Sequence, residues 1–373
     1  MKTTNPFPTT GYIGPDYFCD REEEIRQLRD NLAGNNSTTL IALRRLGKTA
    51  LIRHLFHHIR KDYTTIYLDI LPTEYTEQFF NHFITSVSRS IPEKAGTGKK
   101  IWNFIRSLRP AITYDSLQGI PTITVKADAE ESKRSMADLF ELLEEHPSPV
   151  LIAIDEFQQI LSYPESNTDA WLRSVIQKLH NVSFIFSGSQ QHLMQDLFTN
   201  PARPFFRSTQ FMKMERIDRS LYRDFIMRHF NGAKKKMPEK VAGEILDWTE
   251  THTYYVQLLC NRVFTQSARS VTTDDWKREA EKLIKEQEFV FFNYREMLTK
   301  PQWSLLKAIA AEGMVYQPTS SAFLTTYKLG NPATVRRSLT SLEKMELVYH
   351  ETDHTGNRFY GIYDLLFRRW IRG

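Results

Sequence analysis

Two hydrophobic patterns alternate along the first half of the chain. Short runs rich in β-branched residues are separated by stretches in which apolar residues recur every three or four positions, as at 48–59. This alternation is typical of a parallel sheet with crossover helices. The run at 150–154 is continuously apolar, as a central strand buried on both faces requires. The pattern predicts an α/β fold with strands at 39–43, 65–70, 150–154, 182–186 and 209–214.

The pattern changes twice after residue 217. Helical periods without strands come first, at 219–230, 238–250, 254–267 and 273–294. From residue 300, three helices precede two short strands, and Asn331-Pro332 supplies an N-cap and a first-turn proline for the third helix. Three helices and a hairpin predict a winged helix-turn-helix. We therefore predict an α/β core at 1–217, a helical domain at 218–296 and a winged helix at 297–373.

Within the predicted core, residues from about 92 to 128 interrupt the alternation. This stretch is rich in glycine and proline, and residues 120–126 have the pattern of a short strand. We interpret it as an insertion with a small hairpin. Residues 96–100 contain a glycine–lysine pair but follow no strand, so we interpret them as a solvated loop.

Residues 42–49 carry the strongest chemical signal. They read ALRRLGKT and match the P-loop pattern GxxxxGK[ST], except that Ala42 replaces the first glycine. In a P-loop, backbone N–H groups and a helix N-terminus converge on phosphates. Lys48 is predicted to reach the β- and γ-phosphates, and Thr49 to bind Mg²⁺. A chance match is disfavoured by the flanking strand and helix. The predicted nucleotide-binding residues are Ala42, Arg44, Arg45, Leu46, Gly47, Lys48, Thr49 and Ala50.

Two carboxylates follow the apolar strand at 150–154. Asp155, at the carboxyl end of a central strand, is predicted to hold the Mg²⁺ that Thr49 also binds. Glu156 is placed to polarise an attacking water, which predicts a catalytic base. Two incidental surface acids are the alternative, and the P-loop upstream disfavours it.

Further candidates for phosphate chemistry follow the strand at 182–186. Ser187 begins a Ser-Gly-Ser turn, where a hydroxyl would sense the terminal phosphate or position water, and a plain turn is the alternative. Arg203 and Arg207 flank a short Pro-Phe-Phe loop. Either arginine could supply positive charge to a phosphoryl transition state, and a solvated arginine is the alternative.

Other chemical classes find little support. His54, His57 and His58 share a predicted helix, but no carboxylate stands between them as a zinc-protease motif needs. Cys19 and Cys260 are distant in sequence and read as reduced thiols of a cytoplasmic protein. No run of 18 apolar residues exists, which excludes a membrane span.

Charge favours a polyanionic partner only modestly. The net charge is +5, and residues 297–373 hold ten Lys or Arg against six Asp or Glu. In the helix that Pro332 opens, the apolar period puts Val335, Leu339 and Leu342 inward. Duplex DNA is a candidate partner of this helix, with Arg358 of the wing on a phosphate, and protein docking is the alternative. The residues left for its outer surfaces are Thr334, Arg336, Arg337, Ser338 and Ser341.

Taken in order, these motifs resemble those of the archaeal-type ATPase family within the STAND class of AAA+ proteins, which is related to the origin-recognition initiator ATPases. The resemblance rests on FCDREEEI from Phe18, LRRLGKT from Leu43, IDEFQ from Ile154 and FSGS from Phe186. It implies ATP or ADP bound with Mg²⁺ between an α/β core and a helical lid. It also implies that residues 18–24 lie near the adenine.

This sequence departs from the family pattern at three further points besides Ala42. Phe206 stands where a glycine often precedes the family arginine that Arg207 matches. Thr251 and Thr253 replace the glycine and proline of the lid motif.

The sequence therefore predicts a nucleotide-dependent molecular switch with slow, Mg²⁺-dependent ATP hydrolysis. A protein partner or self-association would go with such a switch. Two other classes stay open, namely a DNA-binding regulatory protein and a scaffold that keeps ATP without turnover.

Overall fold

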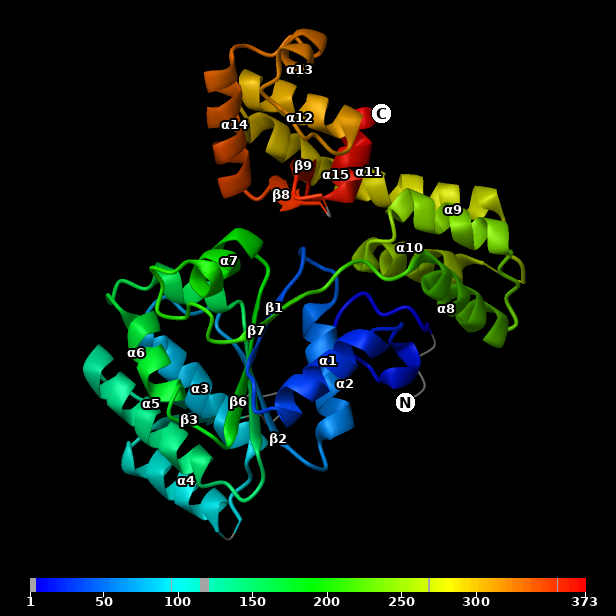
Figure 1. The fold of residues 1–373 in the computed structure, drawn as a ribbon. Helices are drawn as coiled ribbons and strands as arrows, with labels where there is room; N and C mark the ends of the chain where they lie inside the picture. The colour runs from blue at the N-terminus through cyan, green and yellow to red at the C-terminus, as the bar shows by residue number, and fades with distance from the viewer. Residues whose placement is uncertain (1–4, 95, 115–120, 268, 354) are drawn as a thin grey trace. The chain divides into compact units, whose positions relative to one another are not determined.

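The computed structural model describes residues 5–94, 96–114, 121–267, 269–353 and 355–373. The chain divides into two compact units, drawn in Figure 1. One unit is Thr10–Ile217, and the other combines Asp218–Gly373 with the described residues up to Thr9. Ile120 of the predicted strand at 120–126, and His354 of the predicted wing turn, lie outside the described residues.

A five-stranded parallel sheet forms the centre of the unit Thr10–Ile217. Its strands are β1 (Thr38–Ile41), β2 (Thr64–Asp69), β5 (Val150–Asp155), β6 (Val182–Gly188) and β7 (Gln210–Lys213). Their order across the sheet is β2-β5-β6-β1-β7, and β5 and β6 are buried along their whole length. The register puts Asp69 opposite Asp155 and Ile41 opposite Gly188. The carboxyl ends of β1, β5 and β6 therefore meet at one edge of the sheet.

Helices cover both faces of this sheet. Figure 1 shows α1 and α2 on one side and α3, α5 and α6 on the other. The predicted α/β fold with a central parallel sheet is confirmed. The helices are α1 (Glu22–Ala33), α2 (Lys48–Ile59), α3 (Thr76–Ser90), α4 (Thr97–Ser107), α5 (Ala129–Glu144), α6 (Thr168–Ile176) and α7 (Gln191–Thr199), with 3₁₀ turns η1 (Pro15–Tyr17) and η2 (Phe157–Ser162).

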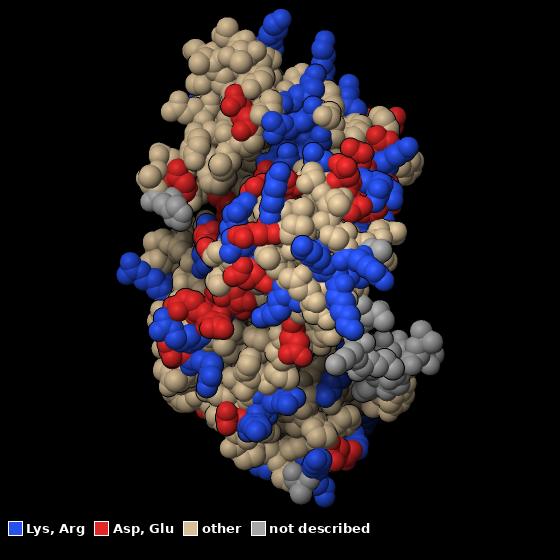
Figure 2. Space-filling view, turned by 90° about the vertical axis from the view of Figure 1, so that its right-hand side faces the viewer, with Lys and Arg blue, Asp and Glu red and all other residues tan. Residues whose placement is uncertain are grey.

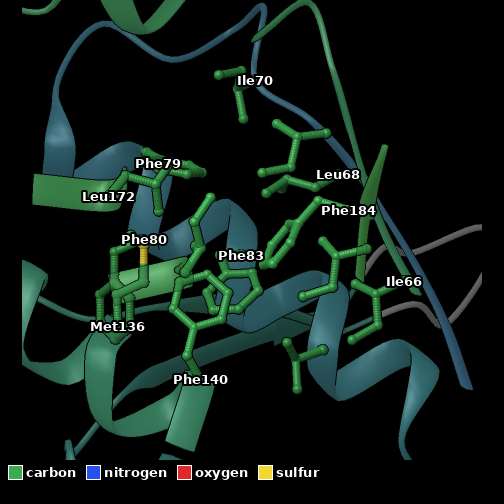
Figure 3. Close-up of a cluster of buried hydrophobic side chains, with 14 of the residues drawn as sticks. Ile66, Leu68, Ile70, Phe79, Phe80, Phe83, Met136, Phe140, Leu172 and Phe184 are labelled. Carbon is green, nitrogen blue, oxygen red and sulfur yellow. The ribbon is translucent and has the colours of Figure 1, made fainter. Parts of the chain in front are cut away.

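The core between the sheet and α3 and α5 is rich in phenylalanine. Figure 3 shows these rings converging with aliphatic side chains of β2. The Phe83 and Phe140 ring centroids are 4.7 Å apart, and Phe140 lies 5.9 Å from Phe184 of β6. Each buried phenylalanine stabilises the fold by roughly 1.5–3 kcal/mol. This packing fixes β2 and β5 in register and thereby positions the residues that follow them.

The stretch from 92 to 128 contains more regular structure than its composition indicated. Strands β3 (Ala111–Tyr114) and β4 (Pro121–Thr124) form an antiparallel hairpin. The interpretation of residues 96–100 as a solvated loop was wrong, because helix α4 begins at Thr97. Ile101 and Ile105 of this helix are buried in the core cluster. Apolar contact with α5 therefore stabilises α4, although no strand directly precedes this helix in the sequence.

The second unit begins with four helices, as the pattern predicted. They are α8 (Arg219–Gly232), α9 (Glu239–Thr249), α10 (Thr253–Gln266) and α11 (Thr273–Met297). Phe7 is fully buried among three of their aromatic side chains, Phe225, Phe230 and Phe264. The described residues up to Thr9 therefore belong with these helices, although the sequence interpretation placed them in the core at 1–217.

A winged helix domain completes the second unit. Its elements are α12 (Lys300–Glu312), α13 (Ser321–Thr326), α14 (Pro332–Lys344), β8 (Val348–Thr352), β9 (Arg358–Ile362) and α15 (Leu365–Arg372). Asn331 caps α14 through its Oδ1, which accepts the Thr334 N–H at 2.9 Å. Val335, Leu339 and Leu342 are buried as predicted. Ser338 is buried as well, so its assignment to the outer surface was wrong, because it lies one turn from the buried Val335 and Leu342 on the packed side of α14.

Candidate nucleotide-binding site

The loop between β1 and α2 has the backbone geometry of a phosphate cradle. Among the described residues of this loop, positive φ angles occur at Arg45 (62°) and Gly47 (102°). Ala42 is buried and keeps a negative φ, so the missing glycine costs no backbone strain. Gly47 precedes α2 without a side-chain cap, which leaves the first N–H groups of the helix available to an anion.

Lys48 is a buried cation at the start of α2, with only 6% of its surface exposed. Burial lowers the pKa of its ammonium group, while the carboxylates of Glu156 and Asp155 act in the opposite direction. A buried ammonium group that depends on nearby negative charge suits a phosphate. Arg44 and Arg45 precede it in the loop, Arg44 half-buried and Arg45 exposed. Leu46 is buried and Ala50 half-buried.

Asp155 is the centre of a hydrogen-bond network at the carboxyl edge of the sheet. Its Oδ2 accepts hydrogen bonds from Thr49 Oγ1 and from the Tyr67 hydroxyl, both at 2.7 Å. Its Oδ1 accepts from Ser187 Oγ at 2.8 Å and from the Glu156 N–H at 3.1 Å. Four donors therefore fix the orientation of this carboxylate.

The pair formed by Thr49 and Asp155 fits a magnesium ion. In an octahedral Mg²⁺ site with oxygens at about 2.1 Å, neighbouring ligands are roughly 3 Å apart. The 2.7 Å between Thr49 Oγ1 and Asp155 Oδ2 is close to that spacing. Both predicted metal ligands therefore lie where one ion could contact them. Three or more His, Cys, Asp or Glu do not converge on a further metal position anywhere in the part of the chain that is described.

Tyr67 was not found from the sequence. It lies on β2, which pairs with β5, and Arg53 of α2 stacks over its ring at 4.0 Å from the centroid. Burial and the charge of Asp155 raise the pKa of Tyr67, so its hydroxyl stays a donor at neutral pH. The sequence shows Tyr67 only as a tyrosine within a short β-branched strand. The register of β2 against β5 is needed to identify Asp155 as its partner.

Glu156 is held in place beside this network. Its φ of 54° turns it away from the line of β5. Its Oε2 accepts hydrogen bonds from Gln158 Nε2 at 2.6 Å, Ser189 Oγ at 2.7 Å and the Ser189 N–H at 3.2 Å. Arg44 Nε contacts the same serine oxygen at 3.4 Å. The end of β6 thus holds the carboxylate that the sequence assigned as the base.

The two serines after β6 have different surroundings. Ser187 is fully buried and donates to Asp155, so its contact orients the carboxylate. Ser189 is the hydroxyl that reaches Glu156. The sequence named the turn that contains both but assigned the catalytic role to Ser187.

The two arginines of the Pro-Phe-Phe loop also differ. Arg203 Nε donates to Asp196 Oδ2 at 2.6 Å, so an ion pair already holds it. Arg207 is exposed, has a φ of 50° and stacks on Phe206 at 5.2 Å. Among the described interactions, neither arginine contacts Asp155 or Glu156.

An aromatic and imidazole cluster lies beside α2. The rings of Phe18 and His54 stack with centroids 4.1 Å apart, and the Tyr12 hydroxyl lies 2.8 Å from His54 Nδ1. Burial and the neighbouring His58 and His57 lower the pKa of His54 to about 4. His54 is therefore neutral at pH 7 and adds apolar ring surface next to the segment that the resemblance placed near the adenine.

The lid motif belongs to the other unit. Glu250 and Thr251 both have left-handed φ angles, 53° and 51°. A β-branched residue is strained in this conformation, which suits the glycine of the family pattern better. Thr253, in place of the proline, begins α10.

Two family models match the chain. A family model described as an ATPase domain predominantly from Archaea matches residues 18–259, and a probable winged helix domain matches residues 289–373. No curated protein sequence matches the chain.

Three solved structures are similar to it in fold. A Walker-type ATPase of Pyrococcus abyssi is 19% identical with a TM-score of 0.67, and the alignment covers 99% of this chain and 100% of that one. The Aeropyrum pernix ORC2 protein, solved as ADPNP-ADP complexes, is 12% identical with a TM-score of 0.64 over 99% and 96% of the two chains. The Aeropyrum pernix ORC1 protein, solved in complex with DNA, is 13% identical with a TM-score of 0.53 over 96% and 93%. None of the described helices combines the length and apolarity that a bilayer crossing requires.

Proposed function

Because the chain belongs to the family of ATPase domains found predominantly in Archaea, we propose that it binds ATP with Mg²⁺ and hydrolyses it to ADP and phosphate. One observation carries the proposal. The P-loop hydroxyl of Thr49 lies 2.7 Å from Asp155 Oδ2, beside the buried ammonium group of Lys48. A loop for phosphates, a cation and a pair of metal ligands thus converge at the edge of one sheet.

The assigned roles follow from these contacts. The backbone from Ala42 to Ala50 holds the phosphates, and Lys48 neutralises their charge. Thr49 and Asp155 hold the metal, which would stabilise the charge on the leaving phosphate oxygens. Tyr67 and Ser187 orient Asp155 through their hydrogen bonds.

Glu156 accepts the proton of the attacking water. Its described hydrogen bonds all end on Oε2, so we assign Oε1 to the water. Ser189 and Gln158 keep the carboxylate from rotating. Arg207 follows the Pro-Phe-Phe loop, and its exposed guanidinium group supplies positive charge to the transition state.

We assign the protein to the STAND class as a switch with slow turnover. The support lies in the second unit, where the lid motif is joined to the winged helix. Glu250 forms an ion pair with the buried Arg368 of α15, and Arg369 donates to the Trp248 carbonyl at 2.8 Å. The Tyr255 hydroxyl donates to Asp364 at 3.1 Å. A lid that responds to nucleotide would therefore move α15, and a protein partner or second copy would detect the change.

Duplex DNA is a second candidate partner. Arg336 and Arg337 are exposed on α14, and Arg358 is exposed on β9. On the face that Figure 2 draws, Lys and Arg are interspersed with Asp and Glu. The three arginines of α14 and β9 favour a local contact with phosphates.

Phosphate release from ATP tests the proposal. We expect slow turnover that requires Mg²⁺ and falls in Glu156→Gln. Turnover that appears only with duplex DNA would favour a DNA-dependent regulator. Nucleotide that copurifies with the protein and is never hydrolysed would favour a scaffold and overturn the proposed reaction.

A further inference from the structure

A surface cavity of about 360 Å³ lies in the winged helix, between α14, β9 and the loop that precedes α13. Arg336 of α14 and Arg358 of β9 line it, together with Tyr316, Tyr360 and Leu339. Small-molecule sites typically enclose about 300–1,000 Å³, so the cavity has the size of a ligand site. None of the described lining residues is acidic.

The two arginines make this cavity an anion site. Both are exposed, and among the described residues neither forms an ion pair or a side-chain hydrogen bond. Asp353, a carboxylate at the end of the wing, accepts hydrogen bonds from Thr355 Oγ1 at 2.7 Å and the Asn357 N–H at 3.0 Å, and also from the hydroxyl of Tyr316. Two guanidinium groups therefore face one cavity without a neutralising partner. Their planar donor pairs suit the oxygens of a phosphate.

The rest of the lining indicates more than a phosphate. Tyr316 has 45% of its surface exposed, and Tyr360 is half-buried. These rings and Leu339 offer aromatic and apolar surface that a free phosphate would leave uncovered. A nucleotide combines a phosphate with a flat base, and unpaired bases stack on tyrosine rings.

We infer that this cavity binds one unpaired nucleotide, with its phosphate between Arg336 and Arg358 and its base against the tyrosine rings. The inference does not depend on ATP hydrolysis by the other unit. A nucleotide in a single strand and a free nucleotide offer the same chemistry. A base pair inside a duplex does not, because its base is stacked and paired.

Arg337 separates this inference from binding of α14 in a duplex groove. It neighbours Arg336 and is equally exposed, but it does not line the cavity. Groove binding would use both arginines of α14. Binding in the cavity uses Arg336 together with Arg358 of the wing.

Fluorescence anisotropy on the full chain carrying Lys48→Ala tests the inference, because we expect this change to weaken nucleotide binding at the P-loop by at least about 100-fold. The probes are a labelled single-stranded oligonucleotide, the blunt duplex of the same sequence, and a fluorescent AMP derivative. Arg336→Ala and Arg358→Ala should each weaken single-strand binding by about tenfold, the effect of one charge-assisted hydrogen bond. Arg337→Ala should change the affinity for the single strand by less than about twofold, since Arg337 would attract the ligand only from a distance.

Two further readouts define the ligand. Tyr316→Leu should weaken binding by at least about fivefold if a base stacks there. AMP binding with the same arginine dependence would identify the ligand as a free nucleotide. Binding of the single strand alone would identify it as nucleic acid. Either result supports the inference. An unchanged affinity in Tyr316→Leu would overturn the nucleotide assignment.

Three other results would also overturn it. These are no binding of either unpaired probe at 50 mM salt, binding of the duplex alone, or an equal loss in Arg336→Ala and Arg337→Ala. Phosphate release by the arginine variants with Lys48 intact should equal that of the parent. This control separates failure of the cavity from failure of the ATPase assignment.

Discussion

The network around Asp155 and the cavity around Arg336 are both built from charged side chains, but in opposite ways. Asp155 is 4% exposed and accepts four hydrogen bonds, one each from α2, β2, β6 and the N–H of Glu156. Arg336 and Arg358 are exposed and have no described ion pair. The first region is fixed by the protein itself, whereas the second is left to be completed by a ligand.

This difference determines how each region should respond to change. In the buried network, losing one group leaves another buried polar group without its partner, which affects both folding and activity. In the open cavity, losing an arginine affects binding alone. Salt screens the attraction between the remaining arginine and the ligand. The variants below test this contrast, starting with the largest expected effect.

Lys48→Ala should weaken ATP binding by at least about 100-fold, because backbone N–H groups alone cannot offset the phosphate charge. Titration with a fluorescent ATP analogue measures this. Single-strand binding by the winged helix should stay within about twofold of the parent, since the cavity is a separate site. Unchanged ATP affinity would contradict the P-loop assignment.

Glu156→Gln and Asp155→Ala should separate catalysis from metal binding. The glutamine keeps the shape but cannot accept a proton, so turnover should fall about 100-fold or more while ATP still binds. The alanine removes a metal ligand and should abolish the Mg²⁺ dependence of binding. Phosphate release and ATP titration with and without Mg²⁺ measure both effects. Parental turnover in both variants would mean that these acids are incidental.

Tyr67→Phe tests whether the hydrogen bonds around Asp155 hold the metal site together. It removes one donor from Oδ2, so we expect a loss of about 1 kcal/mol in the free energy of unfolding. Mg²⁺ affinity should fall about tenfold, as for other groups that orient metal ligands. The half-buried Tyr63, mutated to Phe, is the control. Equal effects of the two variants on Mg²⁺ would show that Tyr67 has no positioning role.

The pKa of His54 predicts the smallest effect. Its value of about 4 in the folded chain lies below the ordinary 6.5, because of burial first and nearby histidines second. The unfolded chain binds a proton that the folded chain does not, so stability is complete above pH 6.5 and falls toward pH 4. Since His54 is half-exposed, we expect the free energy of unfolding to fall by only about 1 kcal/mol between pH 7 and pH 5.

Urea unfolding at the two pH values measures this change. His54→Gln should flatten the pH dependence, whereas His180→Gln, at an exposed position, should not. The same slope in the parent and in His54→Gln would show that burial and the neighbouring histidines do not make His54 resist protonation.

Much of the fold follows from local patterns in the sequence. The period of three to four apolar residues and the Gly47 turn set helix α2 at 48–59, and the structure has the same bounds. The Asn331-Pro332 start of α14 was readable for the same reason, since caps act within one turn. Local patterns carried no such signal where apolar burial depends on a distant element, as for α4 and for Phe7.

The candidate site divides in the same way. Lys48, Thr49 and Asp155 were readable because each belongs to a short motif whose chemistry depends on a strand end and the start of a helix. Tyr67 and Ser189 were not, because their partners Asp155 and Glu156 lie 88 and 33 residues away along the chain. The pairing of β2 with β5 and of β5 with β6 brings them together.

The cavity of the winged helix depends entirely on tertiary structure. The sequence marked Arg336 and Arg358 as separate candidates for contact with duplex DNA, one on a helix and one on a strand, but did not show that they share a cavity. The sequence by itself determined which residues could carry phosphate chemistry, since residue type and local spacing suffice for that. Which of them share a site was decided by the fold, because hydrogen bonds and charge act over a few ångströms in space, and only packing brings distant segments that close.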